Sequence, residues 1–289
     1  MSDSGTPIAV TGATGQLGRL VVRHLADLGA PMRLLVRDPA RAPEIAGAEV
    51  VAAEYEHPLS FRAALDGVRT VFLVSAHEAA DRMDLHRSVV ATIADAGVER
   101  VVYTSFLGAA PQASFSFARD HALTERAIRE AGLELTALRD GMYGEYAPLL
   151  VQDGVIRGPA ADGRVAWVAR EDIARVAATV LTTDGHEGQI YDVTGPEAIT
   201  LAETAEVLAE VSGRPVRYEP ETVEQARASR SYAEDWEIDG WVGTYVGIAT
   251  GEMGVTSHSV ELLTGRRPWT LRELLHAEPE LIAPLTKDA

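Results

Sequence analysis

The chain of 289 residues contains no cysteine. Disulfide bonds, thiolate metal sites and a cysteine nucleophile are therefore excluded, and this composition is compatible with the cytoplasm, where we expect the protein to act. Long apolar runs are also missing, because the longest are of strand length and a membrane span needs roughly 20 residues. No signal peptide is expected before the first strand.

Basic charge is scarce, since the formal net charge is −17 and the pI is about 4.9. Such a surface repels phosphate backbones, so we expect a small-molecule partner and no nucleic acid. The patterns G-x-S-x-G and His-x-x-x-His do not occur, so neither a hydrolase elbow nor a metal site is expected. A hydrophobic content of 46% allows a sizeable core.

The most informative segment follows the first apolar run, 8–10. A loop with glycines at positions 12, 15 and 18 comes next, and helical spacing of apolar residues begins at once. A strand, a glycine loop and a helix in this order bind a dinucleotide pyrophosphate, because glycine allows a tight turn and a close backbone approach. The predicted cofactor contacts here are Gly12, Thr14, Gly15, Gln16, Leu17 and Gly18.

Strands and helices alternate along the first half of the chain. Strands are expected at 32–36, 49–53, 70–74, 100–104 and 133–138, and helices at 17–28, 80–96 and 117–131, with a short helix from Ser60 to Gly67. This alternation predicts an α/β fold, a Rossmann-type doubly wound parallel sheet covered on both faces.

The alternation breaks after position 139. The segment 141–163 is rich in glycine and is expected to form loops, whereas a helix at 170–183 and a strand at 189–194 are expected to return to the sheet. We therefore predict a Rossmann NADP-binding domain over 1–140 together with 164–195. A smaller α/β substrate lobe is predicted over 141–163 and 196–289, with a helix at 201–211, a strand at 215–218 and a closing helix at 271–275.

Arg37 indicates which nicotinamide cofactor is bound. It lies at the end of the second expected strand, about 20 residues beyond the glycine loop, where NAD enzymes carry an acidic residue. A guanidinium suits the 2′-phosphate of NADP, so NADPH is favoured over NADH. Asp38 follows directly, and it either repels that phosphate or faces solvent.

Several motifs resemble those of the NmrA-like, atypical short-chain dehydrogenases, and within them the NAD(P)H:quinone oxidoreductase type 2 branch. They are 11–18, 36–40, 72–76, 103–105, 120–125, 138–143 and 192–195. The resemblance implies a Rossmann domain, NADPH and a small C-terminal lobe. Beyond the glycine loop and Arg37, it implies cofactor contacts from Glu54, Tyr55, Val74, Ser75, Ala76, Gly141 and Met142. Some such proteins reduce quinones or other conjugated carbonyls, while others are redox sensors.

The catalytic Tyr-x-x-x-Lys of ordinary short-chain dehydrogenases is replaced by Phe117 and His121. Because a reduced quinone leaves a stabilised phenolate, it needs a strong acid less than an ordinary ketone does, and the nicotinamide carries the hydride chemistry. His121, which can bond the nicotinamide ribose or donate a proton, is the first catalytic and cofactor-contact candidate. Ser105 is the second candidate for both roles, and it orients a carbonyl or caps a turn. Tyr143 is a further catalytic candidate that reaches the substrate or packs in the fold.

Aromatic and imidazole side chains supply the candidate substrate contacts. They are His77, Tyr143, Tyr146, Trp236 and Trp241, with packing or solvated positions as the alternatives, and His86 is expected on a buried helix face. The leading hypothesis is an NADPH-dependent reductase of a quinone or similar conjugated carbonyl, acting as a monomer or homodimer. A non-catalytic NADP(H)-binding sensor and a biosynthetic ketone or imine reductase are the alternatives.

Overall fold

Short apolar segments form a seven-stranded sheet. Its strands are β1 (Ile8–Thr11), β2 (Met32–Val36), β3 (Glu49–Ala52), β4 (Thr70–Leu73), β5 (Arg100–Phe106), β6 (Glu134–Asp140) and β10 (Ile190–Val193). They lie in the order β10-β6-β5-β4-β1-β2-β3, and the pairs β1–β2, β2–β3, β1–β4 and β4–β5 are parallel. The chain winds outward from β1 in both directions, which confirms the predicted doubly wound α/β fold.

The strand order reverses between β1 and β4. These strands pair in register, with Ile8 opposite Thr70 and Val10 opposite Phe72. In open α/β sheets, ligands bind outside the carboxyl ends of the strands at such a switch point. The loops that follow Thr11 and Leu73 therefore hold the position where a cofactor is expected.

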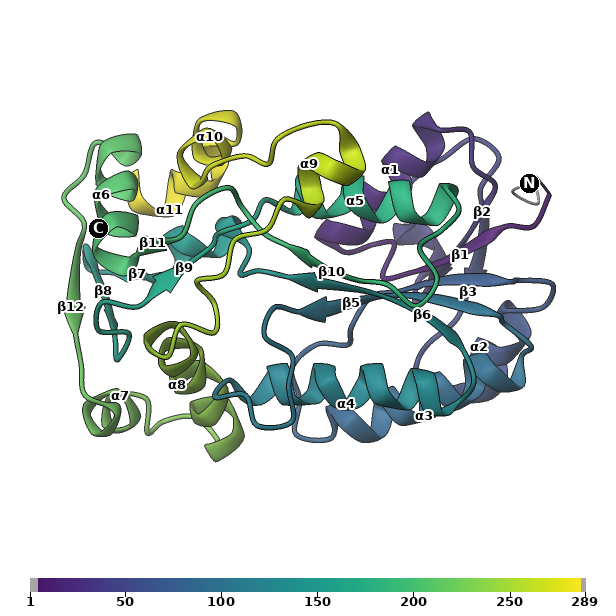
Figure 1. Cartoon of the computed structure of the whole chain (residues 1–289), viewed down its shortest axis with the longest axis horizontal. Helices are drawn as coiled ribbons and strands as arrows, with labels where there is room; N and C mark the ends of the chain where they lie inside the picture. The colour runs from purple at the N-terminus through teal and green to yellow at the C-terminus, as the bar shows by residue number, and fades with distance from the viewer. Residues whose placement is uncertain (1–4, 287–289) are drawn as a thin grey trace. The chain divides into compact units, whose positions relative to one another are not determined.

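Helices cover both faces of the sheet, as Figure 1 shows, with α2, α3 and α4 on one face and α1 and α5 on the other. Their bounds are α1 (Gln16–Asp27), α2 (Pro58–Ala64), α3 (Arg82–Asp95), α4 (Ser116–Glu130) and α5 (Arg170–Thr182). Phe61 of α2, Ile93 of α3 and Ile128 of α4 are buried against strand residues such as Val71 and Val101. Burial of this apolar area is the main favourable term for the first face.

The computed structural model describes residues 5–286. The expectation that no signal peptide precedes the first strand therefore falls partly on residues 1–4, which lie outside the described residues. The chain divides into two compact units. Unit 1 spans 5–105, 120–139 and 173–191, and unit 2 spans 106–119, 140–172 and 192–286. None of the helices described within 5–286 has the length and hydropathy needed to cross a bilayer.

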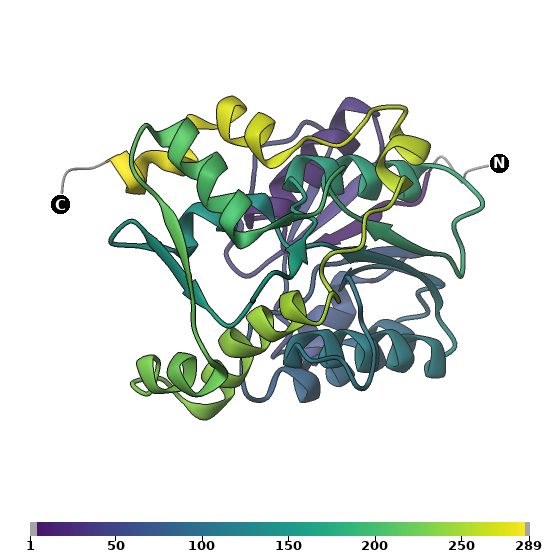
Figure 2. The same cartoon turned by 60° about the vertical axis from the view of Figure 1, so that its left-hand side comes forward.

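Unit 2 is built on two small sheets and several helices. The strands β7 (Val151–Gln152), β8 (Val155–Gly158) and β12 (Arg217–Pro220) form one sheet, and β9 (Arg164–Val165) pairs with β11 (Ile199–Thr200) in the other. Figure 2 shows β7, β8 and β12 with α6 beside them. The helices are η2 (Gly144–Leu150), α6 (Leu201–Ser212), α7 (Val223–Ser229), α8 (Asp235–Ala249), α9 (Ser259–Thr264), α10 (Leu271–Ala277), η3 (Pro279–Ile282) and α11 (Ala283–Thr286).

Three local expectations were wrong. The short helix expected from Ser60 to Gly67 spans Pro58–Ala64 after His57, and the Ser60 hydroxyl donates to the His57 carbonyl oxygen within its first turn. The segment 141–163 is not only loop, since it carries η2 and the β7–β8 hairpin. The chain does not close with the helix at 271, because η3 and α11 follow it.

Candidate functional site

The glycine loop connects β1 to α1, and two of its glycines cannot be replaced without strain. Gly12 has φ +62°, in the left-handed region that glycine adopts freely. A Cβ at Gly18 would lie 2.0 Å from the carbonyl oxygen of Gly12, so only glycine allows α1 to begin this close to β1. The loop closes through a hydrogen bond of 2.9 Å from the Gly15 amide to the Gly12 carbonyl oxygen.

The N-terminus of α1 suits an anion. Gly15 caps the helix without a side chain, and the first turn contains no acidic residue. The amides of Gln16, Leu17 and Gly18 have no acceptor inside the helix, so they and the helix dipole favour a phosphate. Arg19 fixes the loop from outside, because its guanidinium donates to the carbonyl oxygens of Thr14, at 3.0 Å, and Arg41, at 3.1 Å.

Arg37 follows β2 and is exposed, and within the described chain its guanidinium has no hydrogen-bond or ion-pair partner. Asp38 has a structural task. Its Oδ1 accepts the amide of Ala40 at 3.0 Å and caps the 3-10 helix η1 (Pro39–Arg41). One oxygen of the Asp38 carboxylate thus serves its own turn, and the contact of Arg37 with a 2′-phosphate stays a prediction.

The loop after β4 is held by its backbone. Three successive amides each donate to a side chain: Val74 to Thr11 Oγ1 at 2.9 Å, Ser75 to Thr104 Oγ1 at 2.8 Å, and Ala76 to His86 Nε2 at 3.0 Å. Tyr55 also bonds this loop, since its hydroxyl lies 2.8 Å from the Val74 carbonyl oxygen. These contacts fix the loop 74–76 beside the glycine loop at the switch point.

His121 is buried within unit 1, and both of its ring nitrogens are bonded. Arg82 lies 3.2 Å from Nε2 and can only donate, so Nε2 is an acceptor. The proton of the neutral ring is therefore on Nδ1, which lies 2.9 Å from the hydroxyl of Tyr103. Burial lowers the pKa of His121 well below its usual range, and the Arg82 charge acts in the same direction.

His86 has the same tautomer for the same kind of reason. Its Nε2 accepts the Ala76 amide, so the proton is on Nδ1, 2.8 Å from Thr124 Oγ1. Burial lowers the pKa of His86 to about 3. Arg82, which is 3% exposed, also donates to the Ala76 carbonyl oxygen at 3.1 Å. This network ties α3 and α4 to the loop 74–76, and the catalytic role of His121 stays a prediction.

Ser105 lies at the end of β5 and its hydroxyl donates to Glu125 Oε1 at 2.7 Å. Arg139 binds the same carboxylate through two hydrogen bonds of 2.9 Å. The serine proton therefore points to a buried ion pair. This contact gives no support to the expected orientation of a substrate carbonyl, and that role stays a prediction.

Phe117 is a core residue of unit 2. Its ring packs edge-on against Phe115 and Trp236, with ring centroids 5.5 Å and 6.5 Å away. A Cβ at Gly240 would lie 2.6 Å from this ring, so α8 approaches it closely. Trp236 accordingly has packing contacts, and Trp241 is 36% exposed beside Tyr232.

Tyr143 and Tyr146 form an aromatic pair in unit 2. Their rings are nearly parallel, at 9°, with centroids 6.0 Å apart. The guanidinium carbon of Arg170 lies 4.7 Å from the first centroid and 4.8 Å from the second. Glu145 holds Arg170 by accepting its amide at 2.9 Å and by an ion pair of 3.6 Å. Tyr146 is 47% exposed, and the substrate contacts of both tyrosines stay predictions.

The remaining predicted residues have separate surroundings. Gly141 is buried, and its amide donates to the Val193 carbonyl oxygen at 2.9 Å. Met142 packs against the apolar core of unit 2. Glu54 forms an ion pair with His57 at 3.4 Å, and His77 is exposed. Their cofactor and substrate contacts stay predictions.

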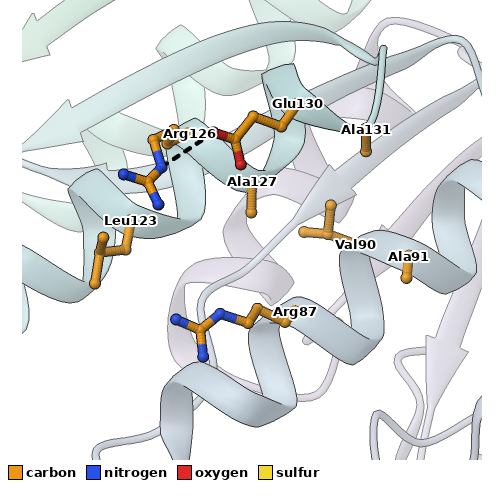
Figure 3. A pocket seen from close by; sticks show the side chains of 8 residues that line it. All are labelled: Arg87, Val90, Ala91, Leu123, Arg126, Ala127, Glu130 and Ala131. Carbon is orange, nitrogen blue, oxygen red and sulfur yellow. Dashed lines mark ion pairs between the residues drawn. The ribbon is translucent and has the colours of Figure 1, made fainter.

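A groove of about 210 Å³ lies on unit 1 between α3 and α4, and Figure 3 shows the side chains around it. None of the predicted site residues lines it. It is lined by Arg87, Val90, Ala91, Leu123, Arg126, Ala127, Glu130 and Ala131. Among residues 5–286, no group of three or more histidine, aspartate or glutamate side chains has an arrangement that could hold a metal ion.

Sequence reasoning missed most of the side chains that hold these loops. Polar residues at strand ends were the available signal for Thr11, Thr104 and Asp140, since side chains there meet at one sheet edge. The roles of Arg82 and Thr124 had no such signal, because they depend on the packing of α3 beside α4.

A parallel doubly wound sheet with a glycine loop and a free helix N-terminus at its switch point defines a Rossmann-type dinucleotide-binding fold. The model of the NmrA-like family matches residues 5–234, and the chain belongs to that family, as the motifs predicted.

Known relatives match along most of the chain. It is 35% identical to quinone oxidoreductase 2 of Escherichia coli over 276 residues, which covers 92% of this chain and 96% of the relative. The solved NADPH complex of the E. coli NADPH-dependent quinone oxidoreductase is similar, with a TM-score of 0.84, 33% identity, and coverage of 93% and 99%. Citrobacter triphenylmethane reductase with NADP(H) has a TM-score of 0.81, 32% identity, and coverage of 93% and 99%.

Proposed function

We propose that the protein is an NADPH-dependent reductase that delivers hydride to quinones, related conjugated carbonyls and cationic triarylmethane dyes. The observation that carries the proposal is the glycine loop, whose free helix amides lie at the switch point of the sheet in a chain of the NmrA-like family. The relatives named above act on quinones and triphenylmethane dyes, which supports this class of acceptor.

The residues of unit 1 fit NADPH. Gly12 and Gly18 lack the Cβ atoms that would fill the approach to the backbone, and the amides at the start of α1 suit the pyrophosphate. Arg37 suits the 2′-phosphate, since it is exposed and Asp38 is occupied by its own turn. When bound, NADPH supplies the hydride, so the chain needs to orient the acceptor, exclude water and supply a proton.

The absence of an acidic side chain at position 117 indicates which class of acceptor the protein reduces. Phe117 is buried among aromatic rings and has no hydroxyl, so an alkoxide would receive no proton there. A reduced quinone is stabilised as a phenolate and needs that proton less. We further infer that unit 1 is the cofactor domain and unit 2 the acceptor lobe, with Tyr143 and Tyr146 as contacts for a flat molecule.

The test is NADPH oxidation by the purified protein with 1,4-benzoquinone, menadione and a cationic triarylmethane dye. We expect turnover with NADPH and slower turnover with NADH at equal concentration. Tight NADPH binding without turnover of any acceptor would refute the reductase and favour the sensor hypothesis.

A further inference from the structure

Asp140 ends β6 and carries a buried carboxyl group that the function described so far does not use. Asp140 is 1% exposed. Oδ2 accepts a hydrogen bond of 3.1 Å from the hydroxyl of Tyr143, whereas Oδ1 is buried and has no hydrogen-bond partner in the described chain. The backbone is fixed on both sides, since the Asp140 carbonyl oxygen accepts the Leu107 amide and the next amide, at Gly141, donates to Val193.

This environment disfavours a carboxylate. A buried charge with a single hydrogen bond costs several kcal/mol, whereas the neutral acid loses much less solvation. Burial raises the pKa of the Asp140 carboxyl well above its usual range, and the hydrogen bond from Tyr143 only partly opposes this. Asp140 is therefore in place as a proton carrier, with Tyr143 as its bonded neighbour.

The other charged group facing this pair is Arg170. Its guanidinium lies against the rings of Tyr143 and Tyr146, and Glu145 balances its charge at 3.6 Å. Burial and the neighbouring Asp140 raise the pKa of Tyr143, and Arg170 opposes that rise. The cation thus reduces the cost of a transient phenolate on Tyr143, although the pKa of Tyr143 stays raised.

We propose that Asp140 is held as a neutral acid and that, through Tyr143, it supplies the proton taken up by a reduced carbonyl acceptor. This inference rests on the proposed reductase function. Hydride addition brings two electrons and leaves a negative charge on the acceptor oxygen. For this step the neutral Asp140 carries its proton on Oδ2 and donates it to the Tyr143 oxygen, while the Tyr143 hydroxyl turns towards the acceptor, which reverses the hydrogen bond between the two side chains. The Tyr143 O–H bond then breaks as its proton moves to the acceptor oxygen, and the Asp140 O–H bond breaks as its proton moves to the Tyr143 oxygen.

Solvent afterwards returns one proton to the Asp140 carboxylate. The sum is acceptor plus NADPH plus one proton, giving the reduced acceptor and NADP⁺. The bonded pair of Asp140 and Tyr143 thus does the work that the phenol of Tyr-x-x-x-Lys does in ordinary short-chain dehydrogenases. Tyr143 is the donor to the acceptor, and Asp140 acts through it as a positioning and proton-supplying residue.

Dyes provide an internal comparison for this relay. A cationic triarylmethane dye takes hydride at its central carbon and becomes neutral, so its reduction consumes no proton. Quinones and conjugated ketones gain an oxygen-bound proton. We therefore compare the ratio of carbonyl to dye reduction for the wild type, Asp140→Asn and Tyr143→Phe, with the exposed Asp153→Asn as the matched control.

Asp140→Asn and Tyr143→Phe are expected to lower this ratio by about 10²-fold or more for acceptors whose reduced oxygen is strongly basic, as general acids contribute 10²–10⁴-fold. The effect should become smaller across a series of quinones as the reduced oxygen becomes less basic. In the wild type, the ratio should fall at high pH, where Asp140 loses its proton, and this fall should be absent in Asp140→Asn. Asp153→Asn should keep the wild-type ratio. Equal slowing of carbonyls and dyes, or an unchanged ratio, overturns the relay.

The charge of Asp140 has its own readout. An infrared difference spectrum between the wild type and Asp140→Asn, recorded at pH 7 without cofactor, should contain the C=O stretch of a protonated carboxyl, and the difference with Asp153→Asn should not. Carboxylate bands alone overturn the inference. A wild type that binds NADPH but reduces no acceptor refutes the function and the relay together, and the infrared band still reports whether Asp140 is neutral.

Discussion

Acid should loosen the network that holds the loop 74–76, and His86 sets the size of the effect. This side chain is 5% exposed and accepts the Ala76 amide through Nε2. Protonation would place two donors face to face and break that bond. The folded chain therefore resists protonation at His86, while the unfolded chain takes up a proton near pH 6.5.

The magnitude follows from the pKa of His86, which is about 3 in the folded chain. Because the folded pKa is depressed, stability is lost as pH falls from about 6.5 towards 3. At 1.36 kcal/mol per pH unit, the loss from this one group is about 2 kcal/mol at pH 5 and about 4 kcal/mol at pH 3. His121 adds to it in the same direction. Because the free energy of unfolding of a domain is about 5–15 kcal/mol, such a loss is a large share of it.

Urea unfolding at pH 7 and pH 5 tests this reasoning in the wild type, His86→Gln and the exposed control His258→Gln. The variant His86→Gln should be less stable at pH 7 by about 1–3 kcal/mol, the cost of disturbing buried hydrogen bonds. It should then lose about 2 kcal/mol less than the wild type between the two pH values. Equal losses in the wild type and His86→Gln would refute the buried neutral imidazole, whatever the carboxylates contribute to all three proteins.

Three further predictions concern stability. Gly18→Ala should destabilise the chain by about 1–3 kcal/mol and weaken NADPH binding in calorimetry, because its Cβ would meet the Gly12 carbonyl, whereas Gly5→Ala, with open space around it, should do neither. Asp140→Asn should gain stability relative to the wild type in urea unfolding as pH rises from about 4, because only the unfolded wild type has then released its proton; a constant difference would contradict the raised pKa. Phe117→Tyr should lower the free energy of unfolding by about 1–3 kcal/mol without creating activity on simple ketones, because the new hydroxyl is buried among aromatic rings; new ketone turnover would show that position 117 reaches the acceptor.

The elements of the sheet were largely predictable from sequence, because short apolar runs and glycine caps act locally. The strand predicted at 32–36 has those bounds, and Gly29 after the first helix has φ +67°, as a helix-ending glycine does. Strands at 100 and 133 begin within a residue of their expected starts, although both run further toward the sheet edge. Periodicity and glycine position carry this information without any tertiary contact.

The side-chain network could not be predicted in the same way. Whether His121 faces a ligand or a buried arginine depends on where α3 packs against α4, a contact between residues 39 positions apart in the chain. Asp38 gave an ambiguous signal for a related reason, since its role as the cap of η1 appears only when the turn is built. Asp140 was not singled out at all, because nothing in the chain pattern shows that one of its oxygens lacks a partner.

The cofactor proposal has one most direct measurement, a calorimetric titration of the wild type and Arg37→Ala with NADPH and NADH. We expect saturable binding of NADPH at one site, a loss of NADPH affinity in Arg37→Ala of about 1.5–3 kcal/mol for a charge-assisted bond to phosphate, and little change for NADH. No saturation of the wild type by either coenzyme at millimolar concentration would contradict the account.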